Sequence, residues 1–389
     1  MNVGFSRRSP TLPWLTVLRY PAALWVVLLH ACNGWITETN VDPVLKLFVE
    51  RGYLGVSFFF ILSGFILAYN YPEVTSPRAY YLARAGRILP VYYLSLLFSL
   101  PLLAPVLQQN NAAEVTPILL AILTLTQAWI PSISSAWNGP AWTLSCEAFF
   151  YFTFPMLLVP LTEWCRGMGR TLMLLALCLG LGLILPILFT WTYGTGSYTE
   201  IAYSAQGDQM QTVKLILERF PLVRLVEFIA GMVLCLGVRA HLHRLSESVA
   251  LLMVIFGVAW VGSSLWIPFI FSMGTFCLPG FALIIVGAAT LPFPVEGGIR
   301  SWLGRAGLLL GNASYAVYLF HAPVLRYLAI LDPEVFIRPD KVTVGFIWGW
   351  FLAAAVIITL LSISIHLLFE EPARRWIRQG IPVFSRPVP

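Results

Sequence analysis

The chain has 389 residues, of which 58% are hydrophobic and only 11% are charged, and its mean hydropathy is +0.80. A soluble globular domain carries about a quarter charged residues, so this chain has too few to cover a water-facing surface. The composition therefore excludes soluble, disordered, collagen-like and disulfide-framework proteins. The excess of six positive charges is typical of cytoplasmic loops, and no nucleic-acid partner is expected. We predict an all-α, polytopic integral membrane protein.

Hydrophobic stretches long enough to cross a bilayer occur along the whole chain. A membrane-spanning helix needs about 20 apolar residues. In chain order the stretches are 12–34, 53–71, 88–108, 115–131, 141–161, 171–193, 220–238, 249–270, 272–294, 313–331 and 342–369. Because no polar stretch between them is long enough to fold alone, we predict one membrane domain over residues 1–389, with no C-terminal extracytoplasmic domain.

The distribution of arginines predicts ten spans, one fewer than the number of apolar stretches. Lys and Arg are retained on the cytoplasmic side, and both ends of the chain are basic, with Arg7 and Arg8 near the start and Arg374 and Arg375 near the end. Two cytoplasmic ends require an even number of crossings. We therefore expect about ten transmembrane helices in the inner (plasma) membrane, and a short or re-entrant segment near 115–131.

The first predicted span carries two ionisable residues, Arg19 and His30, eleven positions apart. Eleven residues are close to three helical turns, so both side chains share a helix face, about 16 Å apart along the axis. Arg19 either extends to lipid headgroups or binds a ligand. His30 is either a packing residue or a general base, and we favour the base because neutral imidazole is suited to that role near pH 7.

Two further arginines, Arg84 and Arg87, are three residues apart at the predicted cytoplasmic interface. This spacing places them on one helix face. Paired guanidinium groups suit bidentate phosphate binding, but the same pair suits anionic lipid. The spacing alone does not decide between ligand and lipid.

Glu147 is expected about 8 Å into a later span. If that span starts outside, Glu147 and His30 lie at similar depths, and a carboxylate beside an imidazole would fix its tautomer. The alternative is that Glu147 pairs with another buried cation, such as Arg224 or Arg326. Arg224 is itself three residues before Glu227, a spacing that predicts a local ion pair.

Several short motifs follow one another along the chain. Arg19-x10-His30 and Arg84-x-x-Arg87 contain the ionisable residues described above. The other segments are Leu62-Ser63-Gly64-Phe65, Trp142-Thr143-Leu144-Ser145-x-Glu147, Ser314-Tyr315-x-x-Tyr318-Leu319-x-His321 and Glu371-x2-Arg374. In order and spacing they resemble the acyltransferase-3 family of integral-membrane acyltransferases, over nearly the whole chain. Pro21 within the first helix and Thr143, where serine is usual, depart from the family pattern.

This resemblance implies an enzyme that moves an acyl group, often acetyl, from acyl-CoA to a hydroxyl of a carbohydrate, a lipid-linked glycan or a macrolide. Acyl-CoA is then a co-substrate, the hydroxyl acceptor and membrane lipids are partners, and no permanently bound cofactor is expected. The six cysteines have no CxxC spacing, so we predict no metal site.

The resemblance also implies roles for particular residues. His30 is expected to be the general base, oriented by Glu147, while Arg19, Arg84 and Arg87 hold the phosphates of CoA. The expected substrate-binding residues are Ser63, Trp142, Ser145, Tyr315 and His321. The alternative function is a transporter or flippase, in which buried Arg, His and Glu residues form a substrate or proton path.

Overall fold

A computed structural model describes residues 12–36, 42–109, 111–194, 207–239, 242, 245–272, 275–294, 298–331 and 343–379. Within these ranges the regular elements are helices and no strand occurs. The all-α prediction is therefore confirmed. The N-terminal arginines Arg7 and Arg8 lie outside the described residues.

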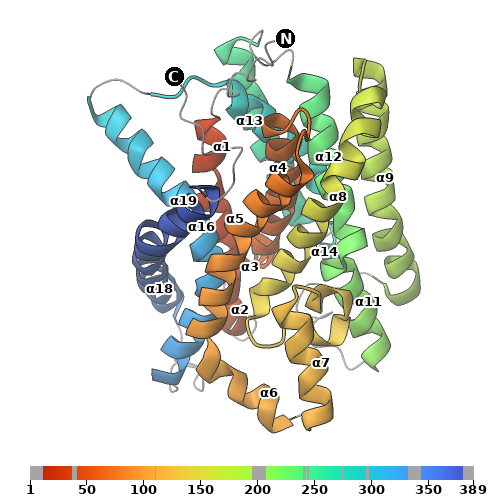
Figure 1. Cartoon of the computed structure of the whole chain (residues 1–389). Helices are drawn as coiled ribbons and strands as arrows, with labels where there is room; N and C mark the ends of the chain where they lie inside the picture. Colours follow the sequence, from red (N-terminus) through yellow and green to blue (C-terminus); the bar gives the residue numbers. More distant parts are fainter. Residues whose placement is uncertain are drawn as a thin grey trace.

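The helices run along one another in a bundle (Figure 1). In chain order they are α1 (Pro13–Val17), α2 (Arg19–Ile36), α3 (Pro43–Glu50), α4 (Leu54–Asn70), α5 (Pro77–Phe98), α6 (Ala104–Gln109), α7 (Ala112–Leu123), α8 (Trp142–Trp164), α9 (Met168–Tyr193), α11 (Gly207–Arg219), α12 (Pro221–Val238), α13 (Glu247–Ser263), α14 (Phe269–Ser272), α15 (Leu278–Thr290), α16 (Gly298–Leu331), α18 (Val344–Ile365) and α19 (Glu371–Gln379), with a π-helical turn η10 (His366–Glu370) between the last two.

Eight helical stretches of the described chain are long and apolar enough to cross a bilayer. They become nine if Pro77–Phe98 and Leu100–Gln108, which meet at a bend of 71°, form one span. The apolar helix Thr275–Thr290 is shorter than these. The structure confirms a polytopic membrane protein, and the count of ten crossings stays a prediction.

The segment near 115–131 is short, as predicted. Its helix α7 has 12 residues, a length of about 18 Å, whereas the hydrocarbon core is about 30 Å thick. Three 3₁₀ turns, η3 (Gln127–Trp129), η4 (Pro131–Ile133) and η5 (Gly139–Ala141), then lead to α8. This irregular connection supplies several residues of a cavity described below.

The first predicted span is interrupted near its start. Helix α1 ends at Val17 and α2 begins at Arg19. Pro21 therefore lies in the first turn of α2, where the backbone N–H groups have no intrahelical acceptor, and the missing N–H of proline costs no hydrogen bond. The break explains how the first span accommodates this departure from the family pattern.

Helices α4 and α12 approach each other closely through two glycines, Gly64 and Gly231. A Cβ at Gly64 would overlap the carbonyl oxygen of Phe228, and a Cβ at Gly231 would overlap that of Ile61. Small residues at such crossings allow two backbones to pack directly in a bilayer. The small residues of the second span are thus packing residues, and this contact holds the centre of the bundle together.

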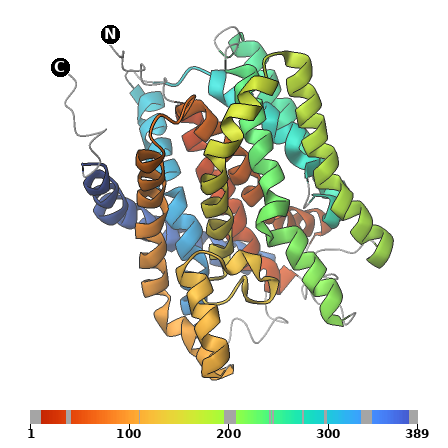
Figure 2. The ribbon, with the colours of Figure 1, turned by 45° about the vertical axis from the view of Figure 1, so that its right-hand side comes forward.

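Four helices, α2, α5, α8 and α16, carry the predicted site residues except Ser63, which lies on α4. Helix α2 contacts α16 and α4, while α5 contacts both α8 and α16. In both ribbon views α1 lies at one end of the bundle and α7 at the other (Figures 1 and 2). Residues at successive positions along these helices therefore line the interior from one end towards the other.

We expect reporter fusions to verify the topology that the arginines predict. A reporter placed after Arg8 and one after Pro389 should both report the cytoplasm, because basic flanks are retained there. A reporter within residues 196–210 should report the opposite side. A cytoplasmic signal from the fusion within 196–210 would contradict the ten-span arrangement.

Candidate active site

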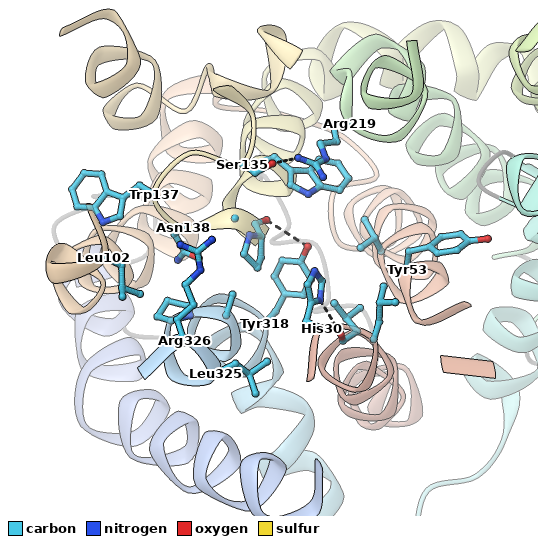
Figure 3. Close-up of a pocket in the computed structure, with 18 of the residues that line it drawn as sticks. His30, Tyr53, Leu102, Ser135, Trp137, Asn138, Arg219, Tyr318, Leu325 and Arg326 are labelled. Atoms are coloured by element: carbon cyan, nitrogen blue, oxygen red, sulfur yellow. Dashed lines mark hydrogen bonds between the residues drawn. The ribbon is translucent and has the colours of Figure 1, made fainter. Parts of the chain in front are cut away.

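A polar cavity in the bundle contains His30, and we call it the histidine cavity. It has a volume of about 360 Å³. Helices α2, α11 and α16 and the connection before α8 contribute to its lining, which includes His30, Trp137, Trp142, Arg219, Tyr318 and Arg326. Figure 3 shows His30 beside Tyr318, with Arg219 and Arg326 on different sides of the cavity. The volume lies in the range of small-molecule sites.

His30 is held by two contacts of its Nδ1 atom. This atom lies 2.9 Å from the carbonyl oxygen of Val26 and 3.3 Å from Nε2 of His321. The Nδ1 atom of His321 lies 2.7 Å from the carbonyl oxygen of Tyr318. A carbonyl oxygen only accepts hydrogen bonds, so Nδ1 carries the proton in both neutral rings. In this arrangement Nδ1–H of His30 donates to the carbonyl oxygen of Val26 and to Nε2 of His321. Nε2 of His30 carries no proton and keeps its lone pair.

The exposure of the two histidines differs. The His30 side chain is exposed at the cavity, whereas His321 is fully buried. The unprotonated nitrogen of His30 is therefore available to a ligand in the cavity. On the other side of the ring, Nδ1–H of His30 donates a hydrogen bond to Nε2 of His321. A second hydrogen-bond partner of this kind fixes the tautomer and the orientation of an imidazole.

A second, narrower cavity of about 40 Å³ contains Glu147 and Arg19, and we call it the glutamate cavity. Ser314 and Tyr315 of α16 also line it. The side chain of Tyr151 interacts with the Glu147 carboxylate and with Ser63. Three residues predicted from separate motifs thus meet here, namely Arg19, Glu147 and Tyr315.

The arginine pair on α5 adjoins this cavity. Arg87, Arg19 and Arg84 are the cations that interact electrostatically with Glu147. Arg84 Nη2 donates to the hydroxyl of Tyr71 at 3.1 Å, while the buried Nε of Arg84 has no hydrogen-bond partner in the described chain. A buried donor without a partner is unusual in proteins, so a ligand with oxygen acceptors is favoured here.

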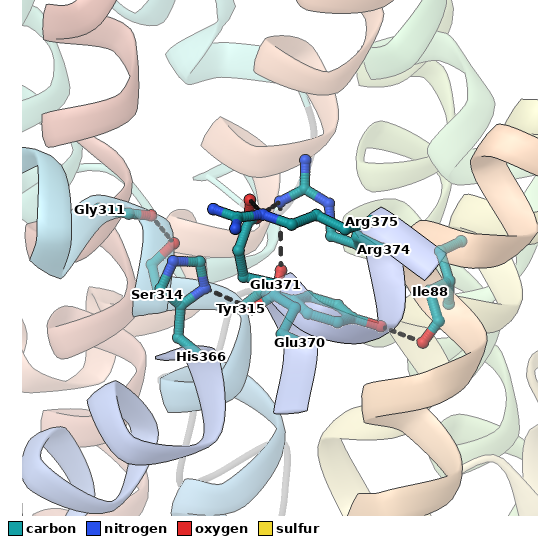
Figure 4. A network of polar contacts seen from close by, with 9 residues as sticks. All are labelled: Ile88, Gly311, Ser314, Tyr315, His366, Glu370, Glu371, Arg374 and Arg375. Carbon is teal, nitrogen blue, oxygen red and sulfur yellow. Dashed lines mark hydrogen bonds and ion pairs between the residues drawn. The ribbon is translucent and has the colours of Figure 1, made fainter. Parts of the chain in front are cut away.

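A polar network of η10 and the start of α19 lies beside Tyr315, whose hydroxyl donates to the carbonyl oxygen of Ile88 at 3.0 Å (Figure 4). The π-helical turn η10 places Nδ1 of His366 2.9 Å from Oε2 of Glu370, and both side chains are buried. Glu370 also interacts electrostatically with Arg19 and Arg87. The cluster of Arg19, Arg84 and Arg87 therefore faces two carboxylates, Glu147 and Glu370, and keeps an excess positive charge.

The two cavities adjoin inside the bundle. Val56 and Tyr318 line both of them. Along α16, Ser314 and Tyr315 line the glutamate cavity, and Arg326 lines the histidine cavity further along the helix. The arginine cluster and the histidine pair therefore lie on either side of Tyr318, at different depths of one interior path.

The predicted contact between Glu147 and His30 does not occur among the described residues. Glu147 lies with the arginines, and His321 is the residue at His30 Nδ1. The alternative, that Glu147 pairs with other buried cations, agrees with its place beside Arg87, Arg19 and Arg84, but the two examples given, Arg224 and Arg326, lie elsewhere. Arg224 Nη2 lies 2.8 Å from Oε2 of Glu227, which confirms that local ion pair, and Arg326 lines the histidine cavity.

Two predicted substrate-binding residues have structural contacts instead of a place in either cavity. The hydroxyl of Ser145 is buried and accepts a hydrogen bond from the backbone N–H of Ala128 at 3.3 Å, so it supports the connection before α8. Ser63 interacts with the side chain of Tyr151, which in turn interacts with Glu147. Trp142, Tyr315 and His321 lie at the cavities or directly against His30.

Two residues of the histidine cavity, Trp137 and Arg219, were not among the predicted site residues. Arg219 ends α11, and Trp137 belongs to the irregular connection before α8. Both lie outside the apolar runs, where a polar residue needs no special explanation. In the sequence, Trp137 and Arg219 are recognisable only as a tryptophan and an arginine near the ends of predicted spans. Such residues are equally typical of anchors at the membrane interface, so their position does not indicate a binding site.

No group of three or more potential metal ligands occurs in the described part of the chain. The site instead combines an exposed histidine, a buried histidine, and a cluster of arginines with carboxylates. These groups define a polar site enclosed within a membrane-spanning helix bundle.

Comparison with known proteins places this site in a family. The family model described as an acyltransferase domain matches residues 12–367. The acyltransferase MdmB of Streptomyces mycarofaciens is 28% identical, with 98% of this chain and 96% of the relative aligned. The Bacillus subtilis protein named "Putative peptidoglycan O-acetyltransferase YrhL" is 24% identical over 97% of this chain and 56% of its own length. No solved structure matches significantly.

The chain therefore belongs to the acyltransferase-3 family, as the motifs predicted. It is an O-acyltransferase built as a multi-pass membrane protein. A further relative, the exopolysaccharide production protein ExoZ of Rhizobium meliloti, is 24% identical over 83% of this chain and 90% of its own length.

Proposed function

We propose that this O-acyltransferase takes its acyl group from acyl-CoA and passes it to a hydroxyl of a carbohydrate, a lipid-linked glycan or a macrolide-type acceptor. The observation that carries the proposal is the geometry of His30, whose Nδ1 is held by Val26 and His321 while its ring is exposed at a cavity of about 360 Å³. An imidazole held in this way is suited to take a proton from a hydroxyl group.

The donor binds at the arginine cluster in this proposal. Arg19, Arg84 and Arg87 hold the phosphates of CoA, because planar guanidinium groups match phosphate oxygens. The uncompensated positive charge of the cluster and the buried Nε of Arg84 support this assignment. Glu147 and Glu370 keep the arginine side chains in place, which gives Glu147 a role on the donor side of the path.

The acyl group then meets the acceptor near Tyr318, where the two cavities adjoin. The acceptor hydroxyl gives its proton to Nε2 of His30, and its oxygen forms a bond to the thioester carbonyl carbon. The carbon–sulfur bond breaks, and CoA leaves as the thiol after receiving the proton from His30. His321 stabilises the protonated state of His30 by accepting from its Nδ1–H.

This mechanism sets an orientation in the membrane. Acyl-CoA is a cytoplasmic metabolite, so the arginine cluster faces the cytoplasm, with both termini on that side of the inner membrane. The histidine cavity then lies nearer the opposite face. The positive-inside distribution of arginines supports the same orientation.

Arginine variants provide the test of the donor. Arg84→Ala or Arg87→Ala should raise the KM for acetyl-CoA, because a charge-assisted contact to phosphate is lost, and lysine replacements should recover only part of the loss. Equilibrium binding of radiolabelled acetyl-CoA to the purified parent and variants compares their donor affinities directly and needs no acceptor. Arg78→Ala is the matched control, since Arg78 is an exposed residue of the same helix.

Unchanged donor affinity in both alanine variants would contradict the assignment and make the pair a lipid-binding site. Transfer that continues without acyl-CoA would mean that the enzyme uses another donor.

A further inference from the structure

The acceptor side of the site contains a cation that has no counter-ion among the described residues. Arg326 lines the histidine cavity from α16 and is exposed there. It makes no ion pair or hydrogen bond with any residue that the structure describes. Figure 3 shows it across the cavity from Arg219.

Both terminal nitrogens of Arg219, the other arginine of this cavity, are engaged by its neighbours, and only its Nε has no hydrogen-bond partner among the described residues. Its Nη1 donates to Ser134 Oγ at 3.2 Å and to Ser135 Oγ, and its Nη2 lies 3.7 Å from Oε1 of Glu218. Lys214 is a second cation that interacts with Glu218. The single carboxylate of the cavity is therefore already compensated, and the charge of Arg326 is left for a ligand.

An aromatic side chain is fixed beside these charges. Trp137 has φ of 64°, a left-handed conformation that is unfavourable for a bulky side chain and that clusters at ligand sites. Its indole Nε1 donates to the carbonyl oxygen of Ser99 at 3.0 Å, and the neighbouring Asn138 donates to Ser95 Oγ and to the carbonyl oxygen of Leu319. The connection before α8 is thus tied to α5 and α16, with Trp137 held at the cavity.

We infer that the acceptor is an anionic saccharide, whose phosphate or carboxylate binds Arg326 and whose ring packs against Trp137 while a hydroxyl reaches His30. This inference rests on the proposed function for the identity of the acceptor. A guanidinium group forms its strongest hydrogen bonds with phosphate and carboxylate, and an indole offers an apolar face to the C–H face of a sugar ring. A cavity of about 360 Å³ accommodates one or two sugar rings.

The test compares a charged and an uncharged sugar of the same size. Purified protein in phosphatidylcholine nanodiscs is titrated with glucose 1-phosphate and with glucose, and binding is followed by the shift of Tm. Glucose 1-phosphate should bind more tightly than glucose. Arg326→Gln should weaken binding of glucose 1-phosphate at least about tenfold, the loss expected for one hydrogen bond to a charged group, and should leave binding of glucose unchanged.

Arg300→Gln is the matched control, because Arg300 is an exposed arginine of the same helix outside the cavity. The Arg300→Gln variant should still bind glucose 1-phosphate more tightly than glucose, as the parent does. Equal binding of the two sugars by the parent, or no weakening in Arg326→Gln, would overturn the inference. Binding of glucose 1-phosphate that phosphatidylglycerol in the nanodisc abolishes would assign Arg326 to lipid headgroups and would overturn it as well.

One further variant separates this inference from the proposed function. His30→Gln should keep the preference for glucose 1-phosphate while losing acyl transfer. If transfer from acyl-CoA is absent in the parent but the Arg326-dependent preference is present, the proposed function fails and the anion site stands. If transfer is present and the preference is absent, the anion site fails alone.

Discussion

Replacing His30 with alanine should reduce acyl transfer by at least about 100-fold, because proton transfer by a positioned side chain contributes about 10²–10⁴-fold. The structure gives the physical reason. Nδ1 of the ring is occupied by Val26 and His321, and the His30 side chain is exposed at the cavity. Membrane insertion and folding should persist, since the side chain borders a cavity. The measurement is transfer from labelled acetyl-CoA, normalised to folded protein.

His30→Gln distinguishes a base from a packing residue. Glutamine keeps a hydrogen-bonding group of similar reach but does not accept a proton near neutral pH. A His30→Gln enzyme that works within about threefold of the parent would contradict the catalytic assignment. Glu147→Gln should cause a smaller loss than His30→Ala, and it should act mainly on donor affinity because Glu147 lies among the arginines.

Replacing Gly231 with leucine should prevent α12 from packing on α4 and should abolish most of the folded protein. A side chain at this position overlaps the backbone of Ile61, which cannot move as the end of a flexible side chain could. Overpacking of a well-packed interior costs about 1–3 kcal/mol and more when the obstacle is rigid. The yield of monodisperse protein and its Tm provide the measurement.

Gly180→Leu is the control for this substitution. Gly180 belongs to α9, is exposed, and has open space where a side chain would begin. The same change there should leave yield and Tm near the parent's values. A normal yield from Gly231→Leu would show that the two helices can separate without loss of the fold.

Composition and residue spacing were sufficient to predict the class of protein, the helical fold and the local relations along each helix. Composition required lipid contact, because 11% charged residues cannot solvate a chain of this length. Helical periodicity placed Arg19 and His30 on one face, and the spacing of Arg224 and Glu227 predicted an ion pair that the structure contains. These relations depend only on backbone geometry within one helix, so a sequence pattern reports them.

Which helix faces meet could not be predicted from these local patterns and is seen in the packed bundle. His321 is 291 residues from His30 in the sequence but lies at its Nδ1, and Glu147 joins Arg19, Arg84 and Arg87. The depth of a residue in the membrane, estimated from where its predicted span begins, did not predict these contacts. The break before α2, the bend after α5 and the irregular connection before α8 shift the helices along one another. Long-range packing is set by the sum of many such contacts, and no local period in the sequence encodes the pairing of one helix with another.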